Sequence, residues 1–476
     1  MALGATKGFS QQGKRRFVAC RITFLASITT LFPAPFFMSN GSPPRLLRIG
    51  LAGLGNVGAG VFKNLQKNAA LIQQRTGADL QVARVVVRNL AKPRDVDVPA
   101  DMITTDWRDL INDPDMPVIV ELIGGTAEAF ELVSSALKAK KIVVTGNKAL
   151  LAEHGQQLFA LAEQNGVPIF FEAAVAGGIP IIQTLQEGLI GNHIQSIFGI
   201  INGTCNYILT RMTQAGLSYA DALREAQEKG FAEADPYLDV SGWDAAHKAI
   251  ILASLSYGRW IPQQDVHVEG IERVSATDIE IARRMGYTIK LLSVIRADEQ
   301  GRVEVRTQPS MIPSTHVLAS VSGSFNAVVV QGDIVGETLF YGRGAGQDPT
   351  SSSVISDLCD AAANLIYGFR HSGFVPHGLY GQSKPIDETV SHYYLRLLVK
   401  DQPGVLAQVA SLFGQRSIGI SSVMQPEDLE STTGTTPLML MIHDATLGQM
   451  KDAVQAIAAL DCIVEAPAWM RVETLG

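Results

Sequence analysis

The stretch Arg48-Ile-Gly-Leu-Ala-Gly-Leu-Gly-Asn-Val-Gly58 decides how the first part of the chain folds. A short apolar run typical of a buried strand is followed at once by the spacing G-x-G-x-x-G and then by a helical pattern. In that setting the first glycine permits a tight turn, the second lets the backbone approach a pyrophosphate, and the third allows close helix–strand packing. The helix N-terminus then stabilises phosphate charge. We therefore predict a dinucleotide-binding turn made by Gly53, Gly55, Asn56, Val57 and Gly58.

From Leu47 onward, short β-branched runs alternate with helical stretches. The runs are RIGLAGL, LQVARVVV, PVIVELIG, KIVVTG and VPIFFE. Such alternation is typical of parallel βαβ units. We therefore predict an α/β domain of the Rossmann type, a doubly wound parallel sheet over residues 47–175, to which a helix near 349–367 returns. This context favours a cofactor-binding turn over a glycine-rich turn without a ligand.

Arg88 follows the second predicted strand, where an NAD-selective site usually offers Asp or Glu to the ribose hydroxyls. An arginine there suits the 2′-phosphate of NADP, with Lys92 or Arg94 assisting. The alternative is an exposed, solvated arginine. The sequence favours NADP and leaves NAD possible.

The rest of the chain predicts two further domains. Residues 176–345 combine a strand, consecutive helical segments and more β-rich sequence, which indicates an α+β domain. Residues 368–388 are rich in Gly and Pro and suit a linker. Residues 389–476 follow the order βαββαβ, with strands near 392–399, 420–424, 437–443 and 463–472, which is the ferredoxin-like arrangement.

Composition bounds the class of protein. With 476 residues, 46% of them hydrophobic, the chain is long enough for more than one core. Six of its 39 Lys and Arg residues and no acidic residue lie in positions 1–46, so the remainder carries a formal charge of −13. Such a body repels phosphate backbones, which argues against nucleic-acid partners. The four cysteines are far apart and form no zinc pattern, which indicates a reducing compartment.

Residues 1–46 stand apart as a leader. Their apolar run, 17–37, follows a basic cluster and resembles a signal or transit peptide. However, an arginine and two prolines interrupt this run, and it is short for a membrane helix. A chain that started at Met38 would have the ordinary N-terminus of a cytosolic enzyme. We expect an over-long start or a disordered leader, a cytoplasmic enzyme and no membrane partner, with organelle targeting by residues 1–37 as the open alternative.

Three blocks begin at the carboxyl ends of predicted strands, where open α/β sheets place their ligands. They are ELIGGT (121–126), TGNKALL (145–151) and EAAVAGGIP (172–180). Lys148 therefore lies at the edge that binds the cofactor, although an exposed surface lysine is the simpler alternative.

A further block, GFAEADPYLDVSGWDAAHK (230–248), leads into an apolar helix. Asp244 and Lys248 are four residues apart, so on a helix they share a face and the carboxylate can position the ammonium group. Reduction of an aldehyde requires a proton for the alkoxide formed as hydride arrives, and such a lysine can supply it. Glu233 can receive a substrate ammonium group. The alternative is a surface ion pair of little energetic value.

With these blocks, the chain closely resembles the homoserine dehydrogenases, in the monofunctional form with a C-terminal ACT domain. The resemblance runs from about Leu47 to the C-terminus. It rests on GLGNVG, ELIGGT, TGNKALL, EAAVAGGIPI, INGTCNYIL, GFAEADPYLDVSGWDAAHK and YGRGAGQDPTSSSVISDL, in that order. Seven ordered blocks are far more specific than any one of them.

The resemblance implies reversible reduction of L-aspartate 4-semialdehyde to L-homoserine, on the route to threonine, methionine and isoleucine. It implies that Lys248 donates the proton, that Asp244 positions it, and that Lys148 binds cofactor and helps orient the substrate. The implied substrate-binding residues are Glu233, Gly203, Thr204 and Tyr207, of which the last three belong to a substrate loop, residues 202–207, that lines the pocket. Thr126 and Gly346 join the cofactor site. A sodium ion is implied on the backbone carbonyls of Glu172, Val175, Gly177 and Ile179.

The sequence departs from the family pattern at two positions. Gly146 replaces the usual Ala before Asn-Lys, and Cys205 stands where Thr is common. Neither change removes a functional group on which these predictions depend. Cys205 is interpreted as a packed small residue rather than the catalytic thiol of an aspartate-semialdehyde dehydrogenase.

The ACT-like module implies an amino-acid effector, and we expect feedback inhibition by threonine. Because such modules pack edge to edge, a homodimer or homotetramer is expected, with residues 176–345 carrying both catalysis and dimerisation. A module that only assists assembly is the alternative. Two rival functions stay open: another Rossmann-plus-ACT dehydrogenase of an amino-acid pathway, and a catalytically silent amino-acid sensor.

Overall fold

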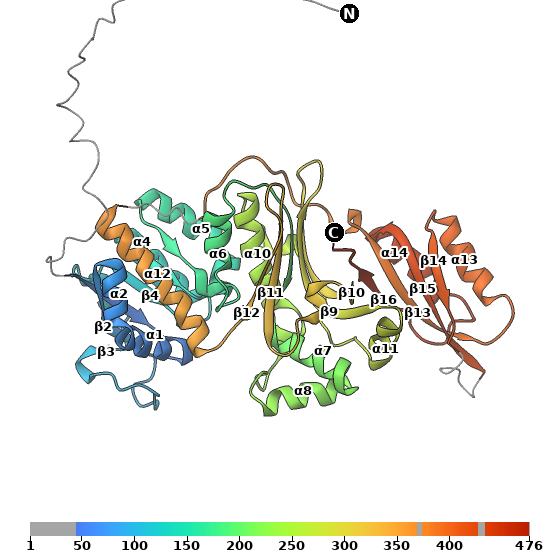
Figure 1. Cartoon of the computed structure of the whole chain (residues 1–476), viewed down its shortest axis with the longest axis horizontal. Coiled ribbons are helices and arrows are strands. Elements are labelled where there is room, and N and C mark those ends of the chain that lie inside the picture. Colours follow the sequence, from blue (N-terminus) through green and yellow to red (C-terminus); the bar gives the residue numbers. More distant parts are fainter. Residues whose placement is uncertain (1–43, 369–373, 427–433, 476) are drawn as a thin grey trace, which may run out of the picture. The chain divides into compact units, whose positions relative to one another are not determined.

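The computed structural model describes residues 44–368, 374–426 and 434–475 (Figure 1). Pro44–Gly476 form one compact unit, and most of the predicted leader, residues 1–43, lies outside the described residues. In the described part of the chain, no helix has both the length and the apolar character needed to cross a membrane.

The first sheet has six parallel strands in the order β3-β2-β1-β4-β5-β6. These are β1 (Arg45–Ala52), β2 (Ala78–Val86), β3 (Ile103–Thr104), β4 (Val118–Glu121), β5 (Ile142–Thr145) and β6 (Ile169–Phe170). The order reverses between β1 and β4, which creates the crevice where doubly wound sheets bind dinucleotides. The predicted Rossmann-type sheet is therefore confirmed, and β1 begins at Arg45 rather than at Leu47.

Helices cover this sheet. They are α1 (Asn56–Lys67), α2 (Ala69–Thr76), α3 (Arg108–Asn112), α4 (Ala127–Lys138), α5 (Lys148–Asn165) and the returning α12 (Gln347–Tyr367). Asn68 lies between α1 and α2 and caps both. Helix α12 packs closely against α1, and a Cβ atom on Gly60 would lie 2.7 Å from Cγ of Gln347. Helix α12, although it lies far downstream in the sequence, thus completes the cofactor-binding domain.

The second sheet has ten strands in the order β12-β11-β7-β9-β10-β16-β13-β15-β14, with β8 beside β10. Its first part comprises β7 (Ile194–Ile200), β8 (His267–Val268), β9 (Tyr287–Ala297), β10 (Val303–Pro313), β11 (Phe325–Gly332) and β12 (Gly336–Arg343). The accompanying helices are α6 (Ile181–Gln183), α7 (Gly203–Ala215), α8 (Tyr219–Glu228), α9 (Tyr237–Val240), α10 (Trp243–Tyr257) and α11 (Ala276–Arg284).

The C-terminal elements follow the predicted βαββαβ order. They are β13 (Val390–Lys400), α13 (Val405–Gln415), β14 (Ile420–Met424), β15 (Thr435–Thr446), α14 (Leu447–Ala458) and β16 (Ala468–Val472). The last strand begins at Ala468, later than the predicted Ile463. It pairs with β13 and also, in parallel, with β10, so this module continues the second sheet.

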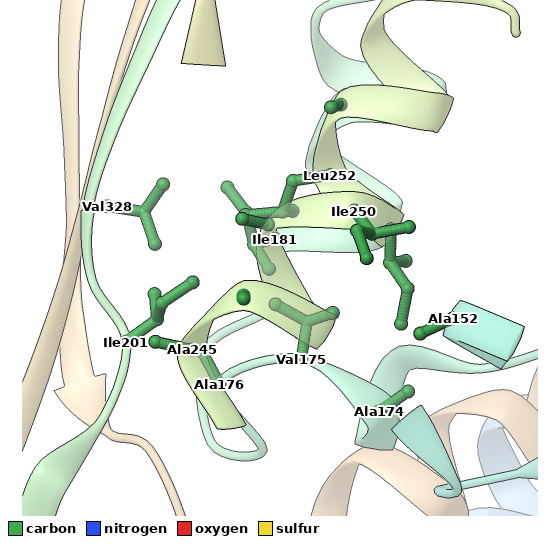
Figure 2. Close-up of a cluster of buried hydrophobic side chains, with 14 of the residues drawn as sticks. Ala152, Ala174, Val175, Ala176, Ile181, Ile201, Ala245, Ile250, Leu252 and Val328 are labelled. Atoms are coloured by element: carbon green, nitrogen blue, oxygen red, sulfur yellow. The ribbon is translucent and has the colours of Figure 1, made fainter. Parts of the chain in front are cut away.

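Helix α10 is anchored in the largest apolar core. Figure 2 shows Ala245 of this helix beside Ile201, which follows β7, and Ala176 from the loop after β6, with Val175 of that loop and Ile250 of α10 farther along the same cluster. All five side chains are at most 1% exposed. Because the buried face of α10 is packed in this way, the charged residues of its first turns are held at a fixed place.

Candidate functional site

The glycine turn has the geometry that its spacing predicts. Gly53 has φ +102°, a region that favours glycine, and a Cβ atom there would clash with the carbonyl of Leu122. A Cβ atom on Gly58 would clash with the carbonyl of Gly53, whereas at Gly55 the space within 4 Å is open. Helix α1 begins at Asn56, followed by Val57, and has neither a side-chain cap nor an acid in its first turn. Its N-terminus can therefore receive a phosphate.

A cavity beside this turn is lined by basic residues. Arg88, Lys92 and Arg94 all face it, together with Trp107 and, as an acid, Glu128. Arg88 Nη2 donates to the carbonyl of Ile123 at 3.1 Å, and its Nε lies 3.6 Å from Glu128 Oε2. The structure thus brings the predicted cations to one side of the turn.

Two other predicted cofactor residues lie at helix starts. Thr126 precedes α4, at the end of the loop that follows β4. Gly346 precedes α12 with φ +132°, which favours glycine, and α12 packs against α1.

Lys148, Asp244 and Lys248 form one cluster. Lys148 is the first residue of α5, and its Nζ lies 3.2 Å from Asp244 Oδ1. Lys248 Nζ donates to Asp244 Oδ2 at 2.7 Å and to the carbonyl of Ile201 at 2.8 Å. The predicted i, i+4 contact between Asp244 and Lys248 on one helix is therefore present. Lys148, from the carboxyl edge of the first sheet, joins this pair.

The environment keeps Asp244 ionised. Burial would raise its pKa, but the ammonium groups of Lys248 and Lys148 and hydrogen bonds from Lys248 and Asn202 hold it well below its ordinary value. The nearby Asp239 has the opposite shift, since burial and the charge of Asp244 raise its pKa. One negative charge is thus shared by two ammonium groups.

Asn202 completes this cluster; it was predicted only as part of the loop 202–207 that lines the substrate pocket, not as a partner of Asp244. Its Nδ2 donates to Asp244 Oδ2 at 2.8 Å and to Asp239 Oδ1 at 2.7 Å, and its Oδ1 caps α7 through the amide of Cys205. The only signal in the sequence is an Asn directly before a predicted helix, which indicates a cap rather than a carboxylate partner.

The predicted substrate residues lie around the start of α7. Gly203 is the first residue of that helix, and a Cβ atom there would lie 2.8 Å from the carbonyl of Ser324. Thr204 donates its hydroxyl to the carbonyl of Phe231 at 2.7 Å, which ties α7 to the loop carrying Glu233. Glu233 itself is exposed.

Tyr207 belongs to a neighbouring cluster. Its hydroxyl donates to Glu225 Oε1 at 2.8 Å, and its ring lies 4.6 Å from the ring of Phe231. Lys229 Nζ donates to the same hydroxyl at 2.9 Å. The sequence placed Tyr207 on the substrate loop, and the structure directs its hydroxyl to α8.

Cys205 is fully buried and donates its thiol to the carbonyl of Asp239 at 3.1 Å. Burial and the charges of Asp239 and Asp244 raise the pKa of this thiol. A buried, protonated thiol is a poor nucleophile, which agrees with the interpretation of Cys205 as a packed residue.

The four residues predicted to hold sodium lie in the buried loop after β6. The carbonyl of Gly177 accepts from the Ser353 hydroxyl at 2.6 Å, and that of Ile179 accepts from the amide of Ile181 at 2.8 Å. The carbonyl of Glu172 accepts from the amide of Val175 at 3.4 Å. A carbonyl oxygen has a second lone pair, so each of these three oxygens can accept one further contact.

Comparison with known proteins agrees with this geometry. A family model described as "Homoserine dehydrogenase, NAD binding domain" matches residues 53–172, and one described as "Homoserine dehydrogenase" matches residues 180–359. The homoserine dehydrogenase of Pseudomonas aeruginosa is 44% identical over 435 residues, which cover 90% of this chain and 99% of the relative.

Solved structures give the same result. A homoserine dehydrogenase from Thiobacillus denitrificans aligns with a TM-score of 0.84 at 39% identity, covering 91% of this chain and 99% of that one. A hyperthermophilic archaeal homoserine dehydrogenase in complex with NADPH aligns with a TM-score of 0.57 at 27% identity, covering 68% and 99%. The chain therefore belongs to the homoserine dehydrogenases, NAD(P)-dependent oxidoreductases of amino-acid biosynthesis.

Proposed function

We propose that the chain catalyses the reversible reduction of L-aspartate 4-semialdehyde to L-homoserine with NADPH, and that Lys248 supplies the proton. The observation that carries this proposal is the cluster in which Asp244 holds Lys248 at 2.7 Å and Lys148 at 3.2 Å. Bound NADPH supplies a hydride to the aldehyde carbon. The aldehyde oxygen then becomes an alkoxide that takes a proton from the Lys248 ammonium group, and in the reverse direction Lys248 accepts that proton.

The hydrogen bonds of Lys248 suit this role. An ammonium group has three donors, and here two of them are engaged by Asp244 and the carbonyl of Ile201. The third is free to point at a substrate oxygen. Lys248 lies in the first turns of a buried helix, so its position changes little between substrate-free and substrate-bound enzyme.

NADP is the proposed cofactor because Arg88, Lys92 and Arg94 line the cavity beside the glycine turn. A 2′-phosphate there would be bound by charge-assisted hydrogen bonds. Glu128 already faces Arg88 at 3.6 Å and limits the net positive charge. The archaeal relative solved with NADPH supports the same assignment.

For the substrate, Glu233 is proposed to bind the amino group, with Gly203, Thr204 and Tyr207 lining the pocket. Gln227 donates through Nε2 to the backbone carbonyl of Glu233 at 3.1 Å, which supports the loop that carries this carboxylate. Because Glu233 is exposed, substrate binding must draw it toward the lysine cluster or leave it at the rim.

One assay tests the reaction and the cofactor together. Oxidation of L-homoserine is followed with NADP and with NAD, for the native protein and for Lys248→Ala. We expect the higher kcat/KM with NADP and a fall in kcat of about 10²–10⁴-fold in the variant, with a small change in KM. Near-native turnover of Lys248→Ala would refute the proton-donor role, and no oxidation with either cofactor would favour the silent sensor.

Further parts of the proposal concern assembly and regulation. We propose a homodimer or homotetramer, feedback inhibition by threonine through residues 389–476, and a sodium ion on the carbonyls of Glu172, Val175, Gly177 and Ile179. The βαββαβ order of the C-terminal elements supports the ACT assignment. Millimolar threonine that changes neither activity nor thermal stability would refute the regulatory part.

A further inference from the structure

Glu121 is a buried carboxylate that the proposed mechanism does not use. It ends strand β4, and its side chain is fully buried. Its Oε1 accepts from the amide of Ile123 at 2.9 Å, and its Oε2 accepts from the Thr145 hydroxyl at 2.6 Å. Burial raises the pKa of Glu121, and these hydrogen bonds oppose the rise. Among the described residues no basic side chain pairs with Glu121, and burying an unpaired carboxylate is costly, which suggests that Glu121 has a specific function.

On one side, Glu121 holds the loop that faces the cofactor turn. The amide of Leu122 donates to Ala52 at the end of β1 at 2.8 Å, and the carbonyl of Leu122 lies against Gly53. The next two carbonyls, those of Ile123 and Gly124, accept from Arg88 Nη2 at 3.1 and 3.4 Å. Residues 122–125 therefore touch both the glycine turn and the arginine proposed to bind the 2′-phosphate.

On the other side, Glu121 holds the start of α5. The Thr145 hydroxyl that donates to Glu121 also accepts from the amide of Asn147 at 3.1 Å. Asn147 Oδ1 caps α5 through the amide of Leu150, and its Nδ2 donates to the carbonyl of Gly125 at 2.7 Å. Lys148 is the next residue after this cap, so the network ends at the lysine that meets Asp244.

Leu122 and Ile123 pack against the apolar cores, but the second half of the loop has little packing of its own. Gly124 and Gly125 have φ +69° and +75°, and a Cβ atom on either would meet nothing within 4 Å. Consecutive glycines in open space are conformationally free. Hydrogen bonds from outside the loop therefore help to select its conformation, and Glu121 and Asn147 make two of them.

We propose that Glu121 is a positioning residue, which sets the cofactor-facing loop 122–125 and the start of α5 at Lys148 in register with each other. The proposal rests on the roles proposed above for Lys148 and NADPH. It differs from a purely structural role, because a buried polar group that only stabilises the fold would change the melting temperature and leave cofactor affinity unchanged.

Four variants test this proposal on the intact chain. Glu121→Leu removes both acceptors, and Glu121→Gln restores them in part, since its amide can accept from Ile123 and donate to Thr145. Thr145→Val removes one hydroxyl without changing the size of the side chain, and it carries the test if Glu121→Leu does not fold. Val118→Ala, a buried residue at the other end of β4, is the control for simple destabilisation.

Three quantities are measured: the Kd for NADPH from cofactor fluorescence, kcat for L-homoserine, and hydrogen exchange of the cofactor-free protein at residues 122–126 and 148–151. For Thr145→Val we expect Kd to rise and kcat to fall by about 10-fold, the effect of losing one hydrogen bond to a charged group. Glu121→Leu loses both hydrogen bonds and should change Kd and kcat at least as much. Exchange becomes faster in both segments. Glu121→Gln recovers most of the affinity and turnover.

Unchanged Kd, kcat and exchange in Glu121→Leu or Thr145→Val, with a melting temperature lowered as in Val118→Ala, would overturn the proposal. Lys148→Ala separates this failure from failure of the proposed function. If Lys148→Ala keeps native turnover, the role of Lys148 is wrong, and the Kd and exchange measurements still decide whether Glu121 positions the loop.

Discussion

Replacing Asp244 by Asn removes the negative charge that Lys148 and Lys248 share. The Asp244–Lys248 contact is 2.7 Å long, with side chains 12% and 11% exposed. Two unit charges 4 Å apart are worth about 4 kcal/mol at an effective dielectric constant of about 20, and breaking a buried pair costs about 3–5 kcal/mol. The Lys148 side chain is 38% exposed, so its contact adds at most about 1 kcal/mol.

One effect opposes this loss. The charge of Asp244 raises the pKa of Asp239, so removing it relieves a repulsion. We therefore expect the free energy of unfolding at pH 7 to fall by about 3 kcal/mol in Asp244→Asn. Turnover should fall by about 10²–10⁴-fold, because Lys248 loses the partner that orients it.

Urea unfolding and steady-state kinetics measure both effects. The pKa of Asp244 is lower in the folded chain than its ordinary value near 4, so its stabilisation is complete above that value and is lost as the pH falls. The difference in stability between native and variant protein should therefore shrink below about pH 4. Asp452→Asn, which removes one exposed ion pair with Arg416, is the control. Native turnover and unchanged stability of Asp244→Asn would refute the reasoning.

Three further predictions concern the cofactor turn and the sheet. Arg88→Ala should raise the KM for NADPH by about 10-fold and leave that for NADH nearly unchanged; equal effects on both would contradict the 2′-phosphate assignment. Gly53→Ala should destabilise the fold by about 1–3 kcal/mol, whereas Gly55→Ala, in open space, should keep native stability and bind NADPH more weakly, both measurable by thermal unfolding and cofactor titration. Glu473→Gln should lower the unfolding free energy by about 3 kcal/mol, because the fully buried Arg306 loses a carboxylate 2.8 Å away; an unchanged urea midpoint would contradict this.

The parts of the site that the sequence predicted are those fixed by short-range geometry. The spacing of Gly53, Gly55 and Gly58 determines a turn of a few residues, and the four-residue spacing of Asp244 and Lys248 places both on one helix face. Lys148 follows a strand, and parallel strands bring their carboxyl ends to one edge. In each case the local chain determines most of the position.

The roles that the sequence did not predict depend on contacts across the fold. Asn202 and Asp244 are 42 positions apart, and Glu121 and Thr145 are 24 apart. A helix cap explains Asn202 in the sequence, and nothing local reveals its second role. Glu121 did leave a signal, since an acid ends the apolar run Val118–Val120 of a central, fully buried strand.

Local sequence patterns also do not predict which neighbour a side chain on a helix will contact. Tyr207 is the last residue of the predicted substrate loop, but its hydroxyl donates to Glu225 of α8. The direction of this hydroxyl depends on where α8 packs against α7. The position of Tyr207 in the sequence carries no information about that packing. The break at Asn68 between α1 and α2 is similar, because the residues on both sides continue a helical pattern.

The connection between the second and third predicted domains shows the same limit on a larger scale. A Gly- and Pro-rich segment predicts a linker, but Gln382 and Lys384 within it exchange backbone hydrogen bonds with Val303. Strand β16 then pairs with β10, and Glu473 reaches the buried Arg306. Composition reports only that a segment is irregular, not whether it is free. Helix α10, which carries Asp244 and Lys248, packs against β9 and β10, so the C-terminal module and this cluster contact the same sheet, which the composition of the connecting segment does not indicate.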